Sequence, residues 1–275
     1  MPLRLLISLI AATLLATTAR AETPGPAPQG QVPPTIAIII DDMGHNLHEG
    51  KRLANLEQPV TLAFLPYRRH TVALAKLAHL RHKEIMLHAP MANTRNFGLG
   101  PGGLTPEMDR QSLKNTLRRA LRSIPHVKGV NNHMGSLLTQ QLEPMDWVMS
   151  ELDRYPVYFV DSRTIASSIA GKVADAYRIP TLTRDVFLDH EQTEEYVDRQ
   201  FKLLIERARK NGSAVGIGHP HKVTVDYLEK NLPKLDEQGI AVATVSGLWA
   251  IRNNNRPMFA EGEKQAIRPA YAKSE

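Results

Sequence analysis

The chain has 275 residues, a net charge of +6 at neutral pH and no cysteine. The missing cysteines exclude disulfides and thiolate metal sites, so any metal must be held by histidines and carboxylates. The basic residues are scattered, without a run of five or six and without interleaved aromatics. We therefore expect no nucleic-acid partner.

The first 21 residues predict a secretory signal peptide. They contain Arg4, an apolar run to about Ala16, and small residues at Ala19 and Ala21. The apolar run is shorter than the ~20 residues that a spanning helix needs, so we expect cleavage after Ala21 and no transmembrane span afterwards. An uncleaved anchor is the alternative. The expected location is the periplasm or the exterior of the cell.

The rest of the chain divides by composition into three parts. Residues 22–34 are rich in Pro, Gly and Gln and predict a linker, and residues 254–275 predict a loosely ordered tail. Residues 35–253 have the length of one folded domain. The oligomeric state is left open.

Short apolar segments alternate with longer amphipathic ones along residues 35–253. Helices are expected at 106–123 and 193–210, where apolar residues recur at helical spacing. Several strands are apolar on both faces, which is typical of a buried parallel sheet. The pattern predicts an α/β fold, a single-domain (β/α) barrel of seven to eight parallel strands, complete or distorted, with a doubly wound open sheet as the alternative. The expected strands are 36–40, 60–65, 84–88, 127–131, 157–160, 181–187, 214–217 and 240–245.

Polar residues follow most of these strands at the carboxyl end, where parallel barrels build their active sites. Any one of them could be an ordinary loop residue, but a mixture dominated by carboxylates and imidazoles favours a site. The cluster consists of Asp41, Asp42, His88, Asn131, Asn132, His133, Asp161, Ser162, Arg184, Asp185, Asp189, His219 and His221.

Three of the 11 histidines stand out because each ends an apolar strand. They are His88, His133 and His219, and an imidazole in that position needs a polar partner. We therefore take these three as candidate metal ligands or acid–base groups.

The motifs together resemble the divergent polysaccharide deacetylases of bacterial envelopes, a branch of the polysaccharide deacetylase barrels. The resemblance spans about residues 35–250 and includes the segments IAIIIDDMG, KEIMLHAPM, GVNNHMGS, VYFVDSRT, RDVFLD and VGIGHPH in that order.

This resemblance implies roles for particular residues. Asp41 would be the catalytic base, Asp42 and His88 metal ligands, and His219 the general acid. The family's second metal histidine falls at Ala92, which cannot bind a metal, and the arginine that orients the base is absent from GVNNHMGS. We expect His133 to replace the missing ligand and complete an Asp-His-His site for a divalent metal, with zinc the expected ion.

Four more residues are expected around the metal, in contact with the substrate or with the ligands: Asn132, Asp161, Arg184 and Asp185. Of these, Asp161 and Asp185 are the expected carboxylate partners of the imidazoles. Asp41 and Asp42 are adjacent, so in a regular strand they point to opposite faces. A base and a ligand on neighbouring residues therefore require the strand to bend there.

The expected function is de-N-acetylation of an amino-sugar polymer of the cell envelope by metal-dependent hydrolysis of the amide bond. The alternative is a non-catalytic barrel that binds an envelope glycan or protein and has lost turnover, as the changes at Ala92 and in GVNNHMGS suggest. A glycosidase with paired carboxylates is a third, weaker reading. Only 5% of the residues are Phe, Trp or Tyr, which is few for a protein that stacks sugars.

Overall fold

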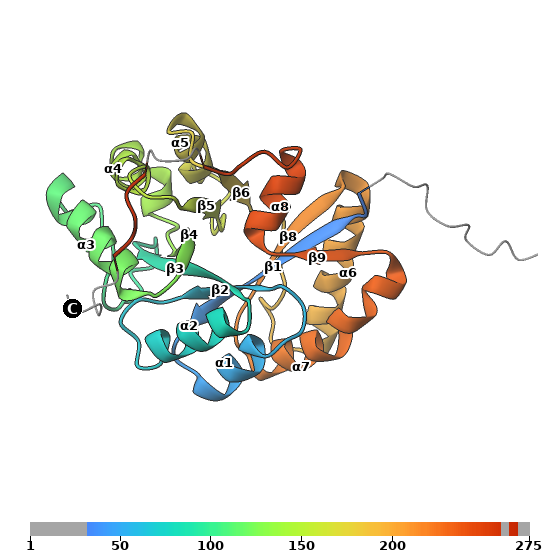
Figure 1. Ribbon diagram of the computed structural model, residues 1–275. Helices are drawn as coiled ribbons and strands as arrows, with labels where there is room; N and C mark the ends of the chain where they lie inside the picture. Colours follow the sequence, from blue (N-terminus) through green and yellow to red (C-terminus); the bar gives the residue numbers. More distant parts are fainter. Residues whose placement is uncertain (1–31, 260–263, 269–275) are drawn as a thin grey trace, which may run out of the picture. The chain divides into compact units, whose positions relative to one another are not determined.

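The computed structural model describes residues 32–259 and 264–268 (Figure 1). The predicted signal peptide, most of the predicted linker and part of the predicted tail lie outside these ranges. No helix among the described residues is long and apolar enough to cross a membrane.

The described strands are parallel and belong to one sheet, in the order β6-β5-β4-β3-β2-β1-β8-β7, with β9 also paired to β1. The strands are β1 (Thr35–Met43), β2 (Thr61–Phe64), β3 (Glu84–Met91), β4 (Val127–Met134), β5 (Tyr158–Asp161), β6 (Thr181–Thr183), β7 (Val186–Phe187), β8 (Ser213–Gly218) and β9 (Ala241–Ala243).

Helices connect the strands, and α1 to α7 cover the outside of the curled sheet, whereas α8 packs against its inner face (Figure 1). They are α1 (Leu47–Ala54), α2 (Thr71–Leu80), α3 (Arg110–Ser123), α4 (Leu142–Leu152), α5 (Ala170–Ala176), α6 (Glu194–Asn211), α7 (Lys222–Asn231) and α8 (Val245–Arg252), with short 3₁₀ turns at 138–140, 232–234 and 236–238. The alternation confirms the predicted single-domain α/β barrel, in a distorted form.

One expected strand is wrong in its extent. Residues 181–187 form two strands, because the chain passes from one edge of the sheet to the other at Arg184 and Asp185. The backbone N–H of Arg184 donates to Asp161 on β5 (3.1 Å), and that of Asp185 donates to Val215 on β8 (2.8 Å). The two edges of the sheet are thus joined by the chain itself, since no ladder pairs β6 with β7 among the described strands.

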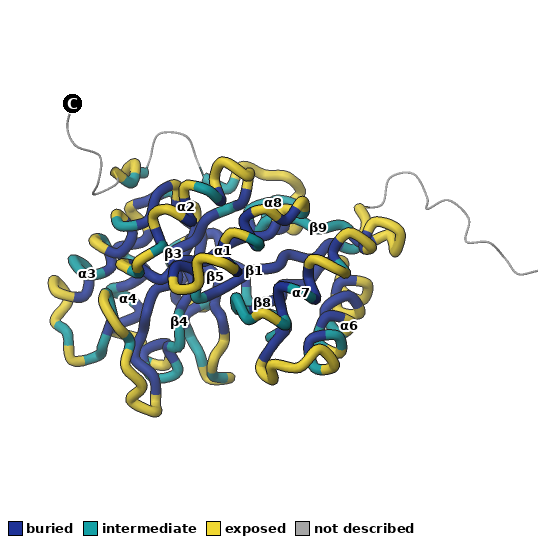
Figure 2. The backbone as a smooth tube through the Cα atoms, turned by 90° about the horizontal axis from the view of Figure 1, so that it is seen from below, coloured by how far each residue is buried: buried dark blue, intermediate teal, exposed yellow. Residues whose placement is uncertain are grey.

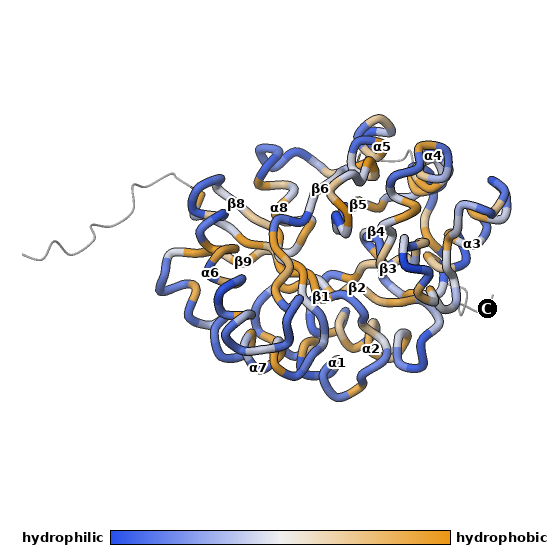
Figure 3. Tube along the Cα trace, turned by 180° about the vertical axis from the view of Figure 1, so that it is seen from behind, coloured by the Kyte–Doolittle hydropathy of each residue, from blue (hydrophilic) through white to orange (hydrophobic). Residues whose placement is uncertain are grey.

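The sheet is buried on both faces, as its apolar strands predict (Figure 2). On β1, Ile36, Ile38 and Ile40 belong to the outer core beneath the helices, whereas Ala37 and Ile39 belong to the inner core. Hydrophobic stretches concentrate in the strands, while the helices alternate hydrophobic and hydrophilic positions (Figure 3). By this alternation Asp41 continues the inner face of β1.

The inner core fills the barrel below the carboxyl ends of the strands. Val245 and Leu248 of α8 pack there against the inner residues of the sheet, and both are fully buried. The interior is therefore apolar, and the polar residues that follow the strands lie at its carboxyl end.

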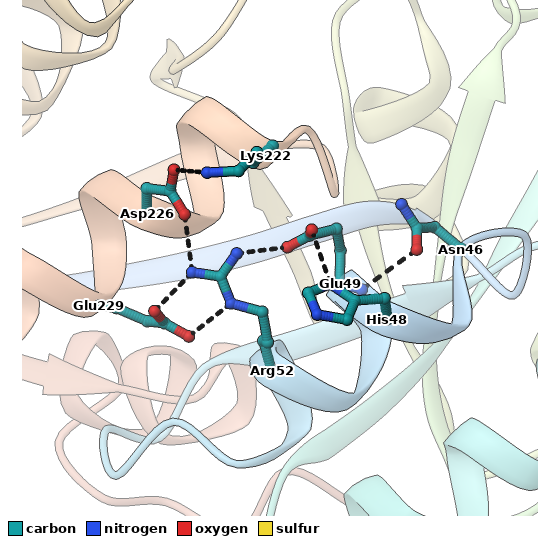
Figure 4. A network of polar contacts seen from close by, with 7 residues as sticks. All are labelled: Asn46, His48, Glu49, Arg52, Lys222, Asp226 and Glu229. Carbon is teal, nitrogen blue, oxygen red and sulfur yellow. Dashed lines mark hydrogen bonds and ion pairs between the residues drawn. The ribbon is translucent and has the colours of Figure 1, made fainter.

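On the outside, a network of charges joins α1 to α7 (Figure 4). Arg52 donates to Glu49 (2.8 Å), to Asp226 (2.7 Å) and to Glu229 (2.6 Å). The Glu49 side chain is only 7% exposed, and its carboxylate is bonded to Arg52 and to Nδ1 of His48 (2.9 Å), with Arg52 as its permanent cation. The network fixes the helices that follow β1 and β8, two strands that carry site residues.

Candidate metal centre and active site

Six strands and the loops that follow them bring most of the predicted residues into one cavity of about 220 Å³. The hollow of about 590 Å³ beside α1 is larger, but it contains none of the strand-end residues. The smaller cavity is lined by Asp41, Asp42, His88, Asn132, His133, Met134, Ser162, Thr164, Phe187, Asp189, His190 and His219.

A bulge in β1 turns both aspartates toward this cavity. Ile40 pairs with Leu62 and Met43 with Phe64, so two residues of β1, Asp41 and Asp42, oppose a single residue of β2. Asp42 has a φ of 53°, in the left-handed region. That conformation costs about 1–3 kcal/mol for a residue other than glycine, although aspartate tolerates it better than most. The bend required for two adjacent functional aspartates is therefore present, at Asp42 itself.

Asp42, His88 and His133 direct one ligand atom each toward a common point. Asp42 Oδ1 lies 3.3 Å from His88 Nε2 and 2.9 Å from His133 Nδ1, and the two imidazole nitrogens are 3.1 Å apart. A tetrahedral zinc with bonds of ~2.0–2.2 Å separates its ligands by roughly 3.3–3.6 Å, a little more than the sides of this triangle. Asp42 Oδ1 is buried and has no hydrogen-bond partner among the described residues. The donor set and its geometry thus fit a divalent metal such as zinc.

Ala92, at the position of the family's second histidine, is 9% exposed and belongs to the outer core. Its backbone is bonded to Leu104 and Leu137. His133 approaches from β4 instead, where it is paired with Pro90 of β3. The structure therefore places His133, and not a residue at position 92, beside Asp42 and His88.

Asn131 connects Asp41 to His88. Its Nδ2 donates to Asp41 Oδ1 (2.7 Å), and its Oδ1 accepts from His88 Nδ1 (2.8 Å). With the proton on Nδ1, His88 has a lone pair on Nε2, the atom that faces Asp42 and His133. Asn131 is fully buried. It belongs to the polar cluster predicted from the sequence, where it was given no role, and it shares a strand face with His133 two residues on.

Asp41 is buried beside the ligands and is suited to accept a proton. Burial raises the pKa of its carboxyl group, and the neighbouring His88 and His219 oppose that rise. At Asp42, burial acts in the same direction, but the imidazoles of His133 and His88 outweigh it and hold the pKa of the carboxyl below its ordinary value. Asp42 is thus held in its ionised form, whereas the raised pKa of Asp41 suits a general base.

His219 follows β8 and is held by Asp189, a member of the predicted polar cluster to which the sequence interpretation gave no role in the site. Its Nδ1 bonds to Asp189 Oδ1 (2.8 Å), and its backbone N–H donates to Asp189 Oδ2 (2.6 Å), which also accepts from Thr224 (2.8 Å). Burial opposes the charged ring, but Asp189 and then Asp41 prevail and raise the pKa of His219 to about 9. Asp189 does not cap α6, because the side chain of Thr193 occupies that position.

The four residues expected around the metal lie in different places. Asn132 lines the cavity, where its Oδ1 accepts from the Ser162 backbone (3.0 Å). Arg184 donates to the carbonyls of Ser162 (2.7 Å) and Arg163 (2.8 Å), and its guanidinium lies 3.8 Å from the centre of the Phe187 ring. Arg184 therefore supports the Phe187 wall of the cavity.

The two expected carboxylate partners of the imidazoles have other contacts. Asp161 accepts from the backbone of Arg163 (2.9 Å) and from the Ser168 hydroxyl (2.8 Å). Asp185 accepts from the Val215 backbone (2.8 Å). Neither is hydrogen-bonded to an imidazole among the described residues, because each carboxylate is used in shaping a loop or the sheet edge. The groups that bond to the imidazoles are Asn131 and Asp189.

Comparisons with known proteins agree with this arrangement. The model of the divergent polysaccharide deacetylase family matches residues 38–249, from β1 into α8. The uncharacterized protein YibQ of Escherichia coli K12 is 38% identical over 201 residues, which are 72% of this chain and 63% of that protein. The chain thus spans less than two thirds of that relative's length. An uncharacterized protein of Haemophilus influenzae is 34% identical over 214 residues, 78% of this chain and 76% of that one.

A similar solved structure is that of the uncharacterized protein ATU2773 from Agrobacterium tumefaciens C58. Its TM-score is 0.76 at 25% identity, over 80% of this chain and 90% of that one. The family match includes the bulged β1, the histidine strands β3 and β4, and the end of β8. The chain belongs to the divergent polysaccharide deacetylase family.

Proposed function

We propose that this protein is a metal-dependent deacetylase that hydrolyses the N-acetyl group of an amino sugar in an envelope glycan. The observation that carries the proposal is the convergence of Asp42, His88 and His133 at mutual distances of 2.9–3.3 Å, between a buried aspartate and a histidine with a raised pKa. The family match supports the class of substrate.

Each residue has one task in this proposal. Asp42, His88 and His133 hold the divalent ion, and zinc is the ion that this donor set favours. The ion supplies a Lewis acid that polarises the amide carbonyl. Asp41 accepts the proton of the attacking water, and His219 donates a proton to the leaving amine, with Asp189 holding the ring in position.

The first experiment is elemental analysis of the purified protein, with Asp42→Ala and His133→Ala beside the wild type. We expect about one zinc or other divalent ion per chain and its loss from both variants. A wild type that takes up no metal even when zinc is supplied would contradict the proposal.

Acetate release from N-acetylated glycans then separates the enzyme from a non-catalytic binding barrel. An active enzyme loses turnover in Asp41→Asn while it retains its metal. A wild type that binds both metal and glycan but releases no acetate would favour the binding protein. The substitution of His133 for the position-92 ligand is the specific reason to test that second function.

The site of action is proposed to be outside the cytoplasm. The signal-like residues 1–21 support this location, and so does a family whose substrates are polysaccharides. Fractionation of cells that produce the full-length protein tests it, with the N-terminal residue of the recovered chain as the readout. A chain that begins at Glu22 is the expected result, and an intact N-terminus in the cytoplasmic fraction would contradict export.

A further inference from the structure

The metal cavity is too small to hold more than a short part of a polymer. Its volume of about 220 Å³ is below the ~300–1,000 Å³ of sites that enclose drug-sized ligands. The neighbouring units of a glycan must therefore lie on the surface around the cavity. That surface is formed by the loops at the carboxyl ends of the strands.

Polar atoms without a hydrogen-bond partner also lie at the carboxyl end of the strands. Three buried side-chain atoms have no hydrogen-bond partner among the described residues: Asp42 Oδ1, Ser162 Oγ and Arg68 Nε. The first two line the metal cavity, and Arg68 is in the loop that follows β2. Buried polar atoms without a partner are rare in folded proteins and often mark a place where a ligand or water binds.

Arg68 lies directly beside the end of β1. The loop that carries it is bonded to that end, because Leu65 N–H donates to Met43 (3.0 Å) and His70 N–H donates to Gly44 (3.0 Å). Its guanidinium packs against Gly100, where any side chain would collide with it. Gly100 has a φ of 74°, which also favours glycine.

His45 follows β1, three residues after Asp42. Burial lowers the pKa of its ring, Arg68 adds to that effect and Asp42 opposes it. Arg68 itself has no ion pair and no hydrogen bond from its side chain to any described residue. A half-buried guanidinium without an anionic partner is costly, and a ligand carboxylate would supply that partner in a bidentate geometry.

An exposed aromatic ring stands next to this arginine. Tyr67 and Phe97 are 47% and 57% exposed, the aromatics among the large hydrophobic residues exposed in the described chain. Tyr67 has a φ of 60°, a strained value for an aromatic residue, and its ring lies against Gly102. Tyr67 is in the loop after β2 and Phe97 in the loop after β3, at the carboxyl end of the strands, where the metal cavity lies. In a chain with few aromatics, this placement favours the stacking of a sugar ring.

We propose that Tyr67 and Arg68 form a subsite for an acidic sugar unit, adjacent to the unit whose acetamido group enters the metal cavity. The carboxylate of that unit binds the guanidinium of Arg68, and its ring packs on Tyr67. Arg119, which is close enough to affect the pKa of Tyr67 and has no acidic partner among the described residues, adds positive charge. The choice of a sugar as ligand rests on the proposed function, but the preference for a carboxylate rests on Arg68.

The test uses the full folded domain with zinc supplied and two probes that differ in one group. The first is a peptide-free glycan strand of alternating N-acetylglucosamine and N-acetylmuramic acid, and the second is the same strand with its carboxylates reduced to alcohols. Calorimetry gives the affinity for each probe. We expect the wild type to bind the acidic strand about 10–100-fold more tightly, the range of a hydrogen-bonded charge pair.

Variants assign the preference to the subsite. Arg68→Gln should weaken binding of the acidic strand to the level of the reduced strand, and Tyr67→Ala should weaken binding of both. Arg81→Gln is the matched control, since Arg81 is an exposed arginine at the end of α2, near the amino end of β3. It should leave the affinity for both strands of glycan unchanged. Thermal melts of each variant confirm that it is folded.

A wild type that does not distinguish the two strands, or binds neither, would overturn the subsite, and so would an equal effect of Arg68→Gln on both probes. Acetate release is measured separately on the same samples. A carboxylate preference without acetate release would leave the subsite standing and refute the deacetylase. Acetate release without a carboxylate preference would support the deacetylase and refute the subsite.

Discussion

Replacement of Asn131 by leucine tests whether the metal site depends on the amide that joins it to the base. Leucine has a similar branched shape but can neither donate to Asp41 (2.7 Å) nor accept from His88 (2.8 Å). Both partners are buried, at 2% exposure each, so water cannot replace the lost bonds. Two buried groups left without a partner cost about 1–3 kcal/mol each, so unfolding should require roughly 2–6 kcal/mol less.

The effect on the metal should be separable from this loss of stability. Without Asn131, the proton on His88 is no longer fixed to Nδ1, and the loss of such a contact typically weakens metal binding by about 10–100-fold. Competition with a chromophoric zinc chelator measures the affinity, and urea unfolding measures the stability. Tyr158→Phe is the control, because it removes one buried hydrogen bond, to Glu84 (2.8 Å), that makes no contact with the ligands. If Asn131→Leu destabilises the fold but binds zinc as tightly as Tyr158→Phe does, Asn131 has no role in orienting His88.

Two further predictions concern charge. In the metal-free protein, the imidazole of His219 should titrate near pH 9 by NMR, and Asp189→Asn should bring its pKa down toward or below the ordinary value. Because this pKa is raised on folding, the stability it contributes is complete below about pH 6.5 and is lost as the pH rises toward 9. Asp189→Asn should therefore flatten the dependence of the unfolding free energy on pH in that window, in the metal-free protein. An unchanged pH dependence would contradict the pairing of His219 with Asp189. Arg52→Ala should lower the free energy of unfolding by about 2–4 kcal/mol, since it leaves the buried carboxylate of Glu49 without its cation. Thermal melting checks this, and a loss no larger than that of an exposed arginine such as Arg81→Ala would show that the network contributes little.

The fold could be predicted from the sequence because its signals are local. Apolar runs on both faces, such as Ile36–Ile40, and amphipathic helices such as Glu194–Asn211 are enough to indicate a parallel α/β barrel. The polar strand ends likewise indicated the edge where the site lies. Asp41, Asp42, His88, His133 and His219 all line one cavity.

What could not be predicted depends on geometry between strands. The bulge at Asp42 and the split of residues 181–187 follow from how strands pair, which single-strand patterns do not contain. The same is true of the partners of the imidazoles. Asp161 and Asp189 both follow strands, and only the path of the loop decides that Asp189 meets His219 while Asp161 turns to its own loop.

The passage of the chain across the sheet edges at Arg184 and Asp185 has a consequence for how the cavity is shaped. Elsewhere along the sheet the described strands are held by ladders of hydrogen bonds, but here two residues and their side chains form the seam. Arg184 joins the β5 side, through Ser162 and Arg163, to the Phe187 wall on the β7 side. One wall of the cavity, at Phe187, therefore depends on a side chain that does not itself line the cavity, so a change at position 184 would act on its shape from outside.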